Sequence, residues 1–96
     1  MRSLLVRPQA QLDITVAAGW YEDQKPDLGY RFLDAVDHLL SRIQRSPLQF
    51  PEIERKVRRG LLQRFPYSVY FSVTEDRIEV IAVLHQHRHP VIWKSR

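Results

Sequence analysis

The sequence contains no cysteine, only three glycines and one methionine, and no long uninterrupted apolar run. The lack of cysteine excludes a disulfide framework and a thiolate metal site, and it suits a reducing compartment. The apolar stretches are far shorter than the roughly 20 residues that cross a bilayer, and the apolar run at 4–6 is too brief for a signal peptide. We therefore expect a soluble cytoplasmic protein that makes no use of a membrane.

Positive charge is scarce in the first half of the sequence and concentrated in the second. Residues 1–54 carry six basic and eight acidic side chains, whereas residues 55–96 carry nine basic and three acidic ones. A concentrated cationic face is the usual footprint of a surface that binds phosphate or an acidic partner, and the alternative is a surface that only keeps the protein soluble. The pattern favours a binding face in the second half.

Apolar spacing predicts the order of the secondary structure. It indicates a strand at 3–6, helices at 9–24 and 28–45, and strands at 57–62, 67–73 and 78–85. A chain of 96 residues forms one domain, here 1–96. We predict an α+β fold of two layers, in which a helical hairpin packs on one face of a four-stranded, mostly antiparallel sheet (β-α-α-β-β-β) and leaves the other face partly open.

Several local features follow from the same spacing. Trp20 and Tyr21 are expected to pack in the core or the hairpin, and Asp27 is expected to cap the second helix. Gly60 is expected to break the first strand of the second half. The apolar residues Leu48 and Phe50 are expected to pin the loop after the second helix.

The ordered set of motifs resembles the RelE/ParE superfamily of toxins from type II toxin–antitoxin systems. The residues that carry the resemblance are Trp20-Tyr21-Glu22, Leu28-Gly29, Phe32, Pro47, Phe50-Pro51, Arg58-Arg59, Phe65-Pro66-Tyr67, Val69-Tyr70-Phe71, and His85 to Arg88 followed by Pro90 and Trp93. The resemblance covers essentially the whole chain. It implies a small growth-inhibiting toxin of the plasmid-stabilisation type, made with a cognate antitoxin protein whose flexible tail folds along it.

The superfamily divides by target, because RelE-like members cut messenger RNA in the ribosome and ParE-like members poison DNA gyrase without cutting RNA. Alignment of 67–70 with the Tyr-Arg-x-Val-Tyr stretch of RelE-like nucleases places Ser68 where those enzymes carry an arginine. The segment from His85 to Arg88 is more similar to the His-x-x-Arg ending of ParE-like chains. The resemblance therefore favours gyrase as the target and a protein that is not an enzyme; an mRNA endonuclease and an inactive toxin-derived binding module remain the alternatives.

Candidate site residues come from the basic and aromatic side chains of the second half. A nuclease would use His85, His87 and Arg88, since imidazole exchanges protons near neutral pH and cations hold the phosphate charge. Binding of the target or of nucleic acid is assigned to cationic and aromatic residues at an exposed sheet face, namely Arg58, Arg59, Arg64, Tyr70, Arg88 and Trp93. Because Arg58 and Arg59 are adjacent in a strand, they are expected to point to opposite faces, so at most one of them can serve a given site.

Alternatives remain for several of these residues. His85 could simply pack at a strand end, Tyr70 could be a half-buried sheet aromatic, and Trp93 could anchor the C-terminal segment. If the strand continued through His85, His87 and His89, these residues would share one face, but the segment lacks the carboxylate that a metal site would want. We expect no metal and no cofactor.

Overall fold

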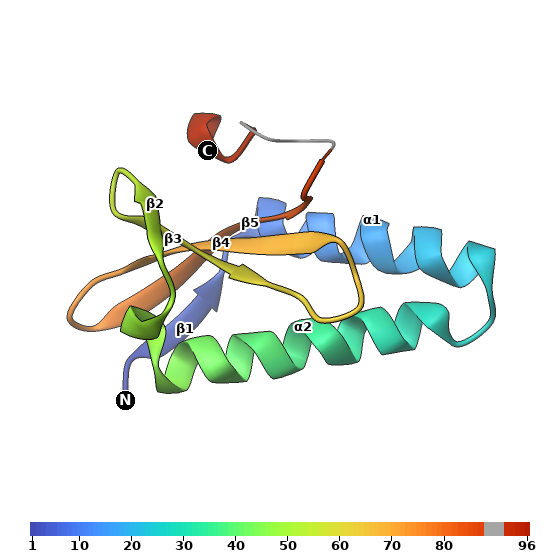
Figure 1. Cartoon of the computed structure of the whole chain (residues 1–96), viewed down its shortest axis with the longest axis horizontal. Helices are drawn as coiled ribbons and strands as arrows, with labels where there is room; N and C mark the ends of the chain where they lie inside the picture. The colour runs from blue at the N-terminus through green and yellow to red at the C-terminus, as the bar shows by residue number, and fades with distance from the viewer. Residues whose placement is uncertain (88–91) are drawn as a thin grey trace.

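The computed structural model describes residues 1–87 and 92–96 of the chain. Two helices follow a short first strand, and the remaining strands follow the helices (Figure 1). In chain order the elements are β1 (Ser3–Val6), α1 (Pro8–Gln24), α2 (Leu28–Arg45), the 3₁₀ turn η1 (Pro47–Gln49), β2 (Glu52–Glu54), β3 (Val57–Leu61), β4 (Tyr67–Val73), β5 (Arg77–His85) and the 3₁₀ turn η2 (Ile92–Ser95).

The strands form one sheet in the order β1-β5-β4-β3-β2. Only β1 and β5 run parallel, and the other neighbours are antiparallel. The predicted α+β fold with a mostly antiparallel sheet is confirmed, and β5 has strand neighbours on both sides as its apolar sequence indicated. The predicted number of four strands is wrong, because β2 adds a fifth. This strand spans only Glu52–Glu54 directly after Pro51, so it is too short and too acidic to show a strand pattern.

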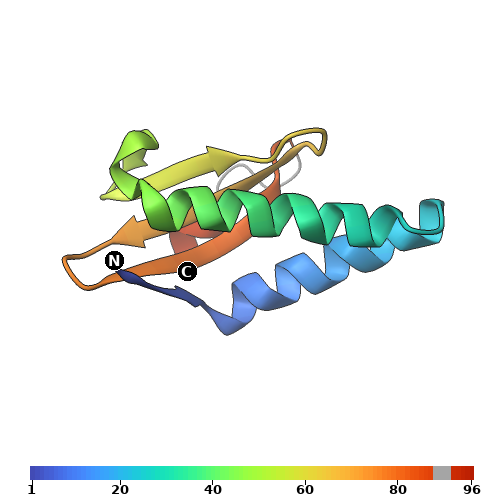
Figure 2. The ribbon, with the colours of Figure 1, turned by 90° about the horizontal axis from the view of Figure 1, so that it is seen from below.

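Both helices lie on one face of the sheet, and the C-terminal turn η2 lies on the other (Figures 1 and 2). α1 begins at Pro8, whose ring presets the helical φ and removes an N–H that would have no partner there. α2 ends at Arg45, and Arg42 and Arg45 in its last turn favour the exposed carbonyl groups. The predicted helical hairpin is confirmed.

The turn between the helices is closed by Glu22. Its carboxylate accepts hydrogen bonds from the backbone N–H groups of Asp27 (3.0 Å) and Gly29 (2.9 Å). Asp27 occupies the position before α2 but has a φ of 79° and makes no side-chain cap, so the predicted role of Asp27 is wrong. Gly29 is required by close packing, since a Cβ there would lie 2.7 Å from the carbonyl oxygen of Ala18.

The main core fills the space between the helical hairpin and the sheet. Both helices and both central strands contribute side chains to it, among them Ile14, Phe32, Val36, Ile43, Phe71, Ile78 and Val80. Tyr21 stacks on Phe32 with ring centroids 5.3 Å apart, which confirms its predicted packing role. Trp20 lies on the outer side of α1 and is 47% exposed, so it is not a core residue, but its ring contacts Tyr21 edge to face with centroids 5.1 Å apart.

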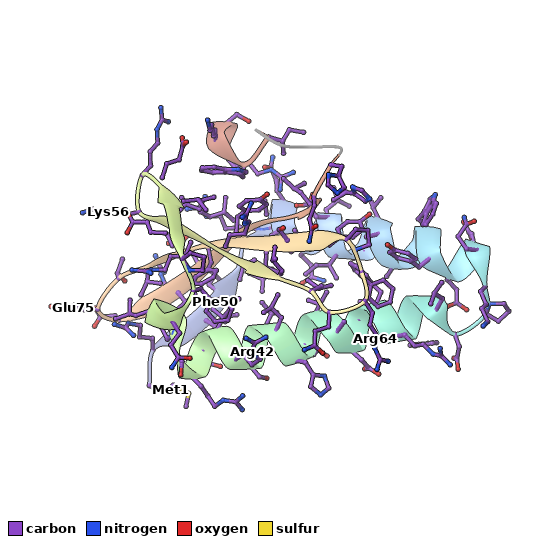
Figure 3. The ribbon with its side chains drawn as sticks, viewed as in Figure 1. Met1, Arg42, Phe50, Lys56, Arg64 and Glu75 are labelled. Atoms are coloured by element: carbon purple, nitrogen blue, oxygen red, sulfur yellow. The ribbon has the colours of Figure 1, made fainter. Side chains whose placement is uncertain are left out.

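The loop after α2 is held by one aromatic residue. Phe50 is buried and points into the molecule (Figure 3), whereas Leu48 is 61% exposed, so only half of the predicted apolar pinning is confirmed. Gly60 does not break β3, which runs unbroken over Val57–Leu61. A Cβ on Gly60 would lie 3.1 Å from the side chains of Leu39 and Phe50, so this glycine makes room for packing rather than for a bend. No helix among the described residues is long and apolar enough to cross a membrane.

Candidate functional site

The sheet face opposite the helices is covered by the chain's own C-terminal segment. Trp93 stacks on Tyr70 with ring centroids 5.5 Å apart and planes 17° from parallel, and the two residues are 6% and 4% exposed. They form a second apolar cluster with Val57, Ile81, Ala82 and Leu84. The prediction of an open polar face is therefore wrong at its centre, and the alternative interpretation of Trp93 as an anchor is confirmed.

Ser68 lies on this covered face and has lost all contact with solvent. Its hydroxyl group is fully buried and has no hydrogen-bond partner in the described structure. Its neighbours across the strands are Leu61 and Leu84, so its surroundings are apolar. A phosphate or a base cannot contact this hydroxyl group while it is buried in this way.

Ion pairs fasten the C-terminal segment to the rest of the molecule. The Arg96 guanidinium donates to both carboxylate oxygens of Asp13, with 3.0 Å between Nη2 and Oδ1. Asp13 also accepts the backbone N–H of Val83 at 3.0 Å, on the stretch of β5 beyond the end of β1. Arg7 donates to the carbonyl oxygen of Arg96 at 3.2 Å. The segment is thus bound through charge-assisted contacts as well as through Trp93.

Arg7 also belongs to a smaller charge cluster on β5. It donates to Glu79 at 2.9 Å, and Arg77 donates to the second Glu79 oxygen at 3.0 Å. The hydrogen bond from Arg7 is the main reason why the pKa of Glu79 lies below its usual value, and the positive charges of Arg7 and Arg77 lower it further, while burial acts in the opposite direction. These contacts hold Arg7, which precedes α1, against Arg77 and Glu79 of β5.

The arginines of the predicted cationic surface do not come together. Arg58 and Arg59 point to opposite sheet faces, as their adjacency requires. Arg58 donates to the carbonyl oxygen of Phe50 at 2.6 Å and lies 3.9 Å from Glu52, so it holds the loop. Arg59 is exposed and lies opposite Tyr70, on the covered face. The expected opposite orientation of Arg58 and Arg59 is confirmed, whereas the expected gathering of the cations on one open face is wrong. Any contact of Arg59 with a target stays a prediction.

The histidines also differ from the expected arrangement. β5 ends at His85, and His87 lies in the turn that follows, so these residues do not continue one strand face. The His87 backbone N–H donates to His85 Nδ1 at 3.1 Å, and the His85 ring lies against Tyr67 with centroids 5.3 Å apart. Arg88 and His89 lie outside the described residues. In the described part of the chain, no three histidine or acidic side chains are grouped as metal ligands would be.

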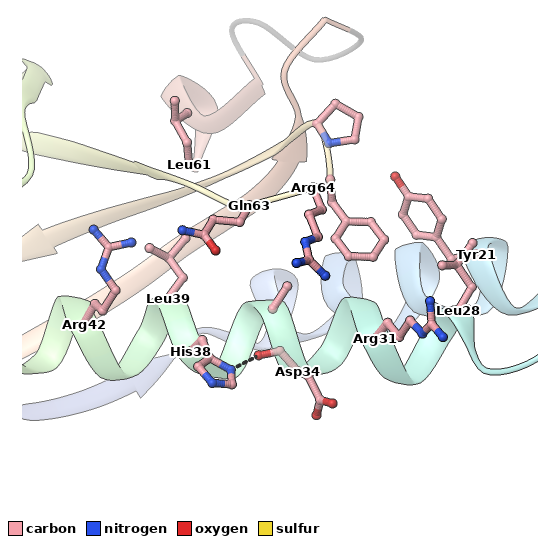
Figure 4. A pocket seen from close by; sticks show the side chains of 13 residues that line it. Tyr21, Leu28, Arg31, Asp34, His38, Leu39, Arg42, Leu61, Gln63 and Arg64 are labelled. Carbon is pink, nitrogen blue, oxygen red and sulfur yellow. Dashed lines mark hydrogen bonds between the residues drawn. The ribbon is translucent and has the colours of Figure 1, made fainter.

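A groove with a volume of about 850 Å³ lies between α2 and the β3–β4 connection (Figure 4). We call it the α2 groove. Arg64, in the connection, has a φ of 70° and points toward α2, and Arg31 and Arg42 stand along that helix. Apolar side chains line much of the rest, including Leu28, Leu39, Leu61 and Phe65, and a single carboxylate, Asp34, joins them.

Sequence reasoning missed the α2 groove, although the signal was present. Arg31, Ala35, His38 and Arg42 recur at steps of four, three and four, which places them on one side of α2 beside its buried stripe. Arg64 could not be assigned to this surface from the sequence, because its position depends on a turn with positive φ. A smaller hollow of about 240 Å³ shares Arg42 and adds Arg45, so the positive surface continues toward the end of α2.

Comparison with known proteins places this architecture in a family. A family model described as "ParE toxin of type II toxin-antitoxin system, parDE" matches residues 4–90. The chain belongs to the ParE toxin family. The predicted membership of the RelE/ParE superfamily is confirmed, and with it the assignment as the toxin component of a type II toxin–antitoxin system.

Relatives and a solved structure agree with this assignment. "Toxin ParE2" of Mycobacterium tuberculosis, from strains CDC 1551 / Oshkosh and ATCC 25618 / H37Rv, is 30% identical over 90 residues, which is 93% of this chain and 86% of the relative. A structure titled "Chromosomal ParDE TA system from P. aeruginosa" superposes with a TM-score of 0.65 at 22% identity, over 88% of this chain and 96% of the other. That likeness supports the ParE fold.

The ParE family match ends before the segment that covers the sheet. Residues 92–96 lie beyond the matched range of 4–90, whereas Tyr70 and Asp13, which receive Trp93 and Arg96, lie within it. The α2 groove lies wholly inside the matched range.

Proposed function

We propose that this ParE-family toxin inhibits growth by binding DNA gyrase through protein contacts, and that it does not cleave RNA. The observation that carries the proposal is the covered sheet face, on which Trp93 stacks over Tyr70 and Ser68 is fully buried. A nuclease acting there needs an exposed base, acid and cation around the phosphate. Here an apolar cluster occupies the middle of that face.

The arrangement of the remaining candidates supports the same conclusion. Arg58 is engaged with the Phe50 carbonyl, and Arg64 lies in the α2 groove on the helix side of the molecule. His85 packs against Tyr67, and its Nδ1 accepts a hydrogen bond from the backbone of His87. Arg59 lies on the opposite sheet face from the helices, whereas Arg64 lies beside α2. A nuclease site that uses both arginines would need them on the same side of the sheet. This separation favours binding over catalysis.

The proposal includes a cognate antitoxin, and we place its acidic tail in the α2 groove. The groove presents three arginines, Arg31, Arg42 and Arg64, against one aspartate, and its walls are largely apolar. A flexible segment that folds on binding gains most where apolar burial and opposite charge coincide. The groove offers both on one side of α2.

The function can be tested by expressing the chain in bacteria without its antitoxin. We expect growth arrest with induction of the DNA-damage response, while translated messages remain intact. Discrete cuts within translated messages, without DNA damage, would show an endonuclease instead. Unchanged growth would show an inactive binding module and would contradict the proposal.

The antitoxin site can be tested by reversing charge in the α2 groove. We expect the double variant Arg31→Glu, Arg64→Glu to lose most of the growth rescue that co-expressed antitoxin provides. Lys56→Glu is the matched control, because Lys56 lies at the tip of the β2–β3 turn, away from Arg42 and Arg64 (Figure 3). Full rescue of the double variant would exclude the groove as the docking site.

A further inference from the structure

α1 carries apolar side chains on both of its sides. Ala10, Ile14 and Ala17 are buried against α2 and the sheet. On the opposite side Leu12, Val16 and Trp20 are 60%, 63% and 47% exposed. The single apolar stripe of an ordinary surface helix faces the core, so a second apolar stripe on the solvent side is a candidate contact surface. Figure 2 shows α1 at the border of the molecule, with α2 on one side and no described element on the other.

The exposed side of α1 also has an ordered polar frame. At 100° per residue, Gln9, Leu12, Val16, Trp20 and Asp23 fall within an arc of about 80°. We call these five residues the α1 outer face. All five are exposed, and Gly19 beside them has open space around its Cα, since a Cβ there would meet nothing within 4 Å. A second helix could therefore approach this face closely.

We propose that the α1 outer face binds the same face of a second copy of this chain, in an antiparallel, two-fold symmetric pair centred on Val16. Leu12 and Trp20 lie four residues on either side of Val16, and Gln9 and Asp23 lie seven residues on either side. In the antiparallel pair Leu12 meets Trp20 of the second copy. Gln9 meets Asp23 of the second copy, and its amide group donates to the carboxylate. Every position of the face thus meets a suitable partner, as an isologous interface requires.

Charge selects a second copy over an acidic partner. The segment from Pro8 to Gln24 contains no lysine or arginine, in a chain with a net charge of +4. The segment also contains three acidic residues, but Asp13 is paired with Arg96 and Glu22 with the N–H groups of the hairpin turn. Asp23 is therefore the one charge of the α1 outer face, so two copies can approach through it, whereas an acidic segment would meet Asp23 and no cation of that face. The two Asp23 carboxylates stay about 21 Å apart along the helix axes, beyond the screening length at physiological salt. Each also lies near the positive N-terminal end of the other α1.

The expected strength of the pair follows from its size. One helical face per copy buries less than the roughly 800 Å² per partner of a standard interface. We therefore expect half of the chains to be dimeric at a concentration of roughly tens of micromolar. The proposal is independent of the toxin's target, because it concerns only the state of the purified chain.

The first experiment measures the mass of the full purified chain by sedimentation equilibrium from about 2 to about 200 µM. We expect the average mass to rise from monomer to dimer. Val16→Glu places two like charges on the symmetry axis and should weaken association by about tenfold or more. Leu48→Glu, which changes an equally exposed leucine in η1, is the control and should leave association unchanged. A monomer throughout the range, or unchanged dimer formation by Val16→Glu, would overturn the proposal.

The second experiment tests the two-fold symmetry by disulfide cross-linking. The chain contains no cysteine, so an introduced cysteine can react only with another introduced cysteine. We expect Val16→Cys to form disulfide dimers on mild oxidation, since residue 16 meets itself. Leu12→Cys alone should cross-link poorly but should link to Trp20→Cys when the two variants are mixed. Leu48→Cys gives the background rate. Cross-linking of Val16→Cys no faster than Leu48→Cys would contradict the two-fold arrangement even if the chain dimerised.

Discussion

At the scale of single residues, the buried hydroxyl of Ser68 is the clearest conflict between sequence and surroundings. Its oxygen has no hydrogen-bond partner in the described structure and is fully buried between apolar neighbours. Leaving such a group without a partner costs about 1–3 kcal/mol. We expect Ser68→Ala to raise the free energy of unfolding by about 1 kcal/mol, measured by urea denaturation. A decrease would show that the hydroxyl has a stabilising partner.

Glu79 gives a pH-dependent test at the same scale. Arg7 and Arg77 hold the pKa of its carboxyl group below the usual 4.5. A lowered folded pKa means that the ionised group stabilises the fold above pH 4.5, and that this contribution is lost as the pH falls through the lower folded value. We expect Glu79→Gln to lose about 0.5 kcal/mol at pH 7 and to show a shallower loss of stability in acid.

The measurement for Glu79 is the urea midpoint as a function of pH. Glu75→Gln is the control, because Glu75 is exposed in the turn between β4 and β5. Equal acid sensitivity of Glu79→Gln and the unmodified chain would show that the Arg7 contact contributes nothing to folding.

At the scale of elements, the two glycines of the helical hairpin make opposite predictions. A Cβ on Gly29 would lie 2.7 Å from a backbone oxygen of α1, so the helices would have to separate. We expect Gly29→Ala to destabilise the fold by about 2 kcal/mol. Gly19 lies in the exposed interior of α1 with nothing near its Cβ position, and we expect Gly19→Ala to stabilise by about 0.5–1 kcal/mol. Thermal unfolding at low protein concentration compares the two.

The attachment of the C-terminal segment is a second property of elements. Asp13→Asn keeps an oxygen that accepts the Val83 N–H but loses the charge that holds Arg96. Because both side chains are largely buried, we expect a loss of about 1–3 kcal/mol. In a Trp20→Phe background, the fluorescence emission of Trp93 should shift toward that of a solvent-exposed tryptophan. The control is Asp23→Asn, on the outer side of α1. If Asp13→Asn leaves the Trp93 emission unchanged, stacking on Tyr70 alone is sufficient to hold the C-terminal segment in place.

The limits of the sequence prediction also lie at the level of elements. Periodicity identified both helices and the strands β4 and β5 to within about two residues, because each buries one face or both. It missed β2, whose three residues carry two glutamates, and it expected a break at Gly60 where the glycine only makes room for Phe50. Local propensity had no access to that contact, because Phe50 reaches it from another part of the chain.

At the scale of the whole molecule, the sequence showed which half of the chain carries the positive charge, but not on which surface that charge lies. Composition placed the cations in the second half, but the fold sends Arg59 to the covered face and Arg64 to the α2 groove. Arg31 and Arg42, from the more acidic half, complete the positive surface on α2. Which sheet face stays open depends on five residues at the C-terminal end, whose docking on Tyr70 and Asp13 is a tertiary event.

The central claim is that the toxin acts on gyrase by contact and leaves RNA uncut, and one purified reaction tests it most directly. The chain is added to gyrase with relaxed plasmid DNA and, in parallel, to a translation extract programmed with a labelled message. We expect loss of supercoiling or accumulation of gyrase-linked broken DNA, with the message intact. Undisturbed supercoiling together with discrete cuts in the translated message would contradict the account.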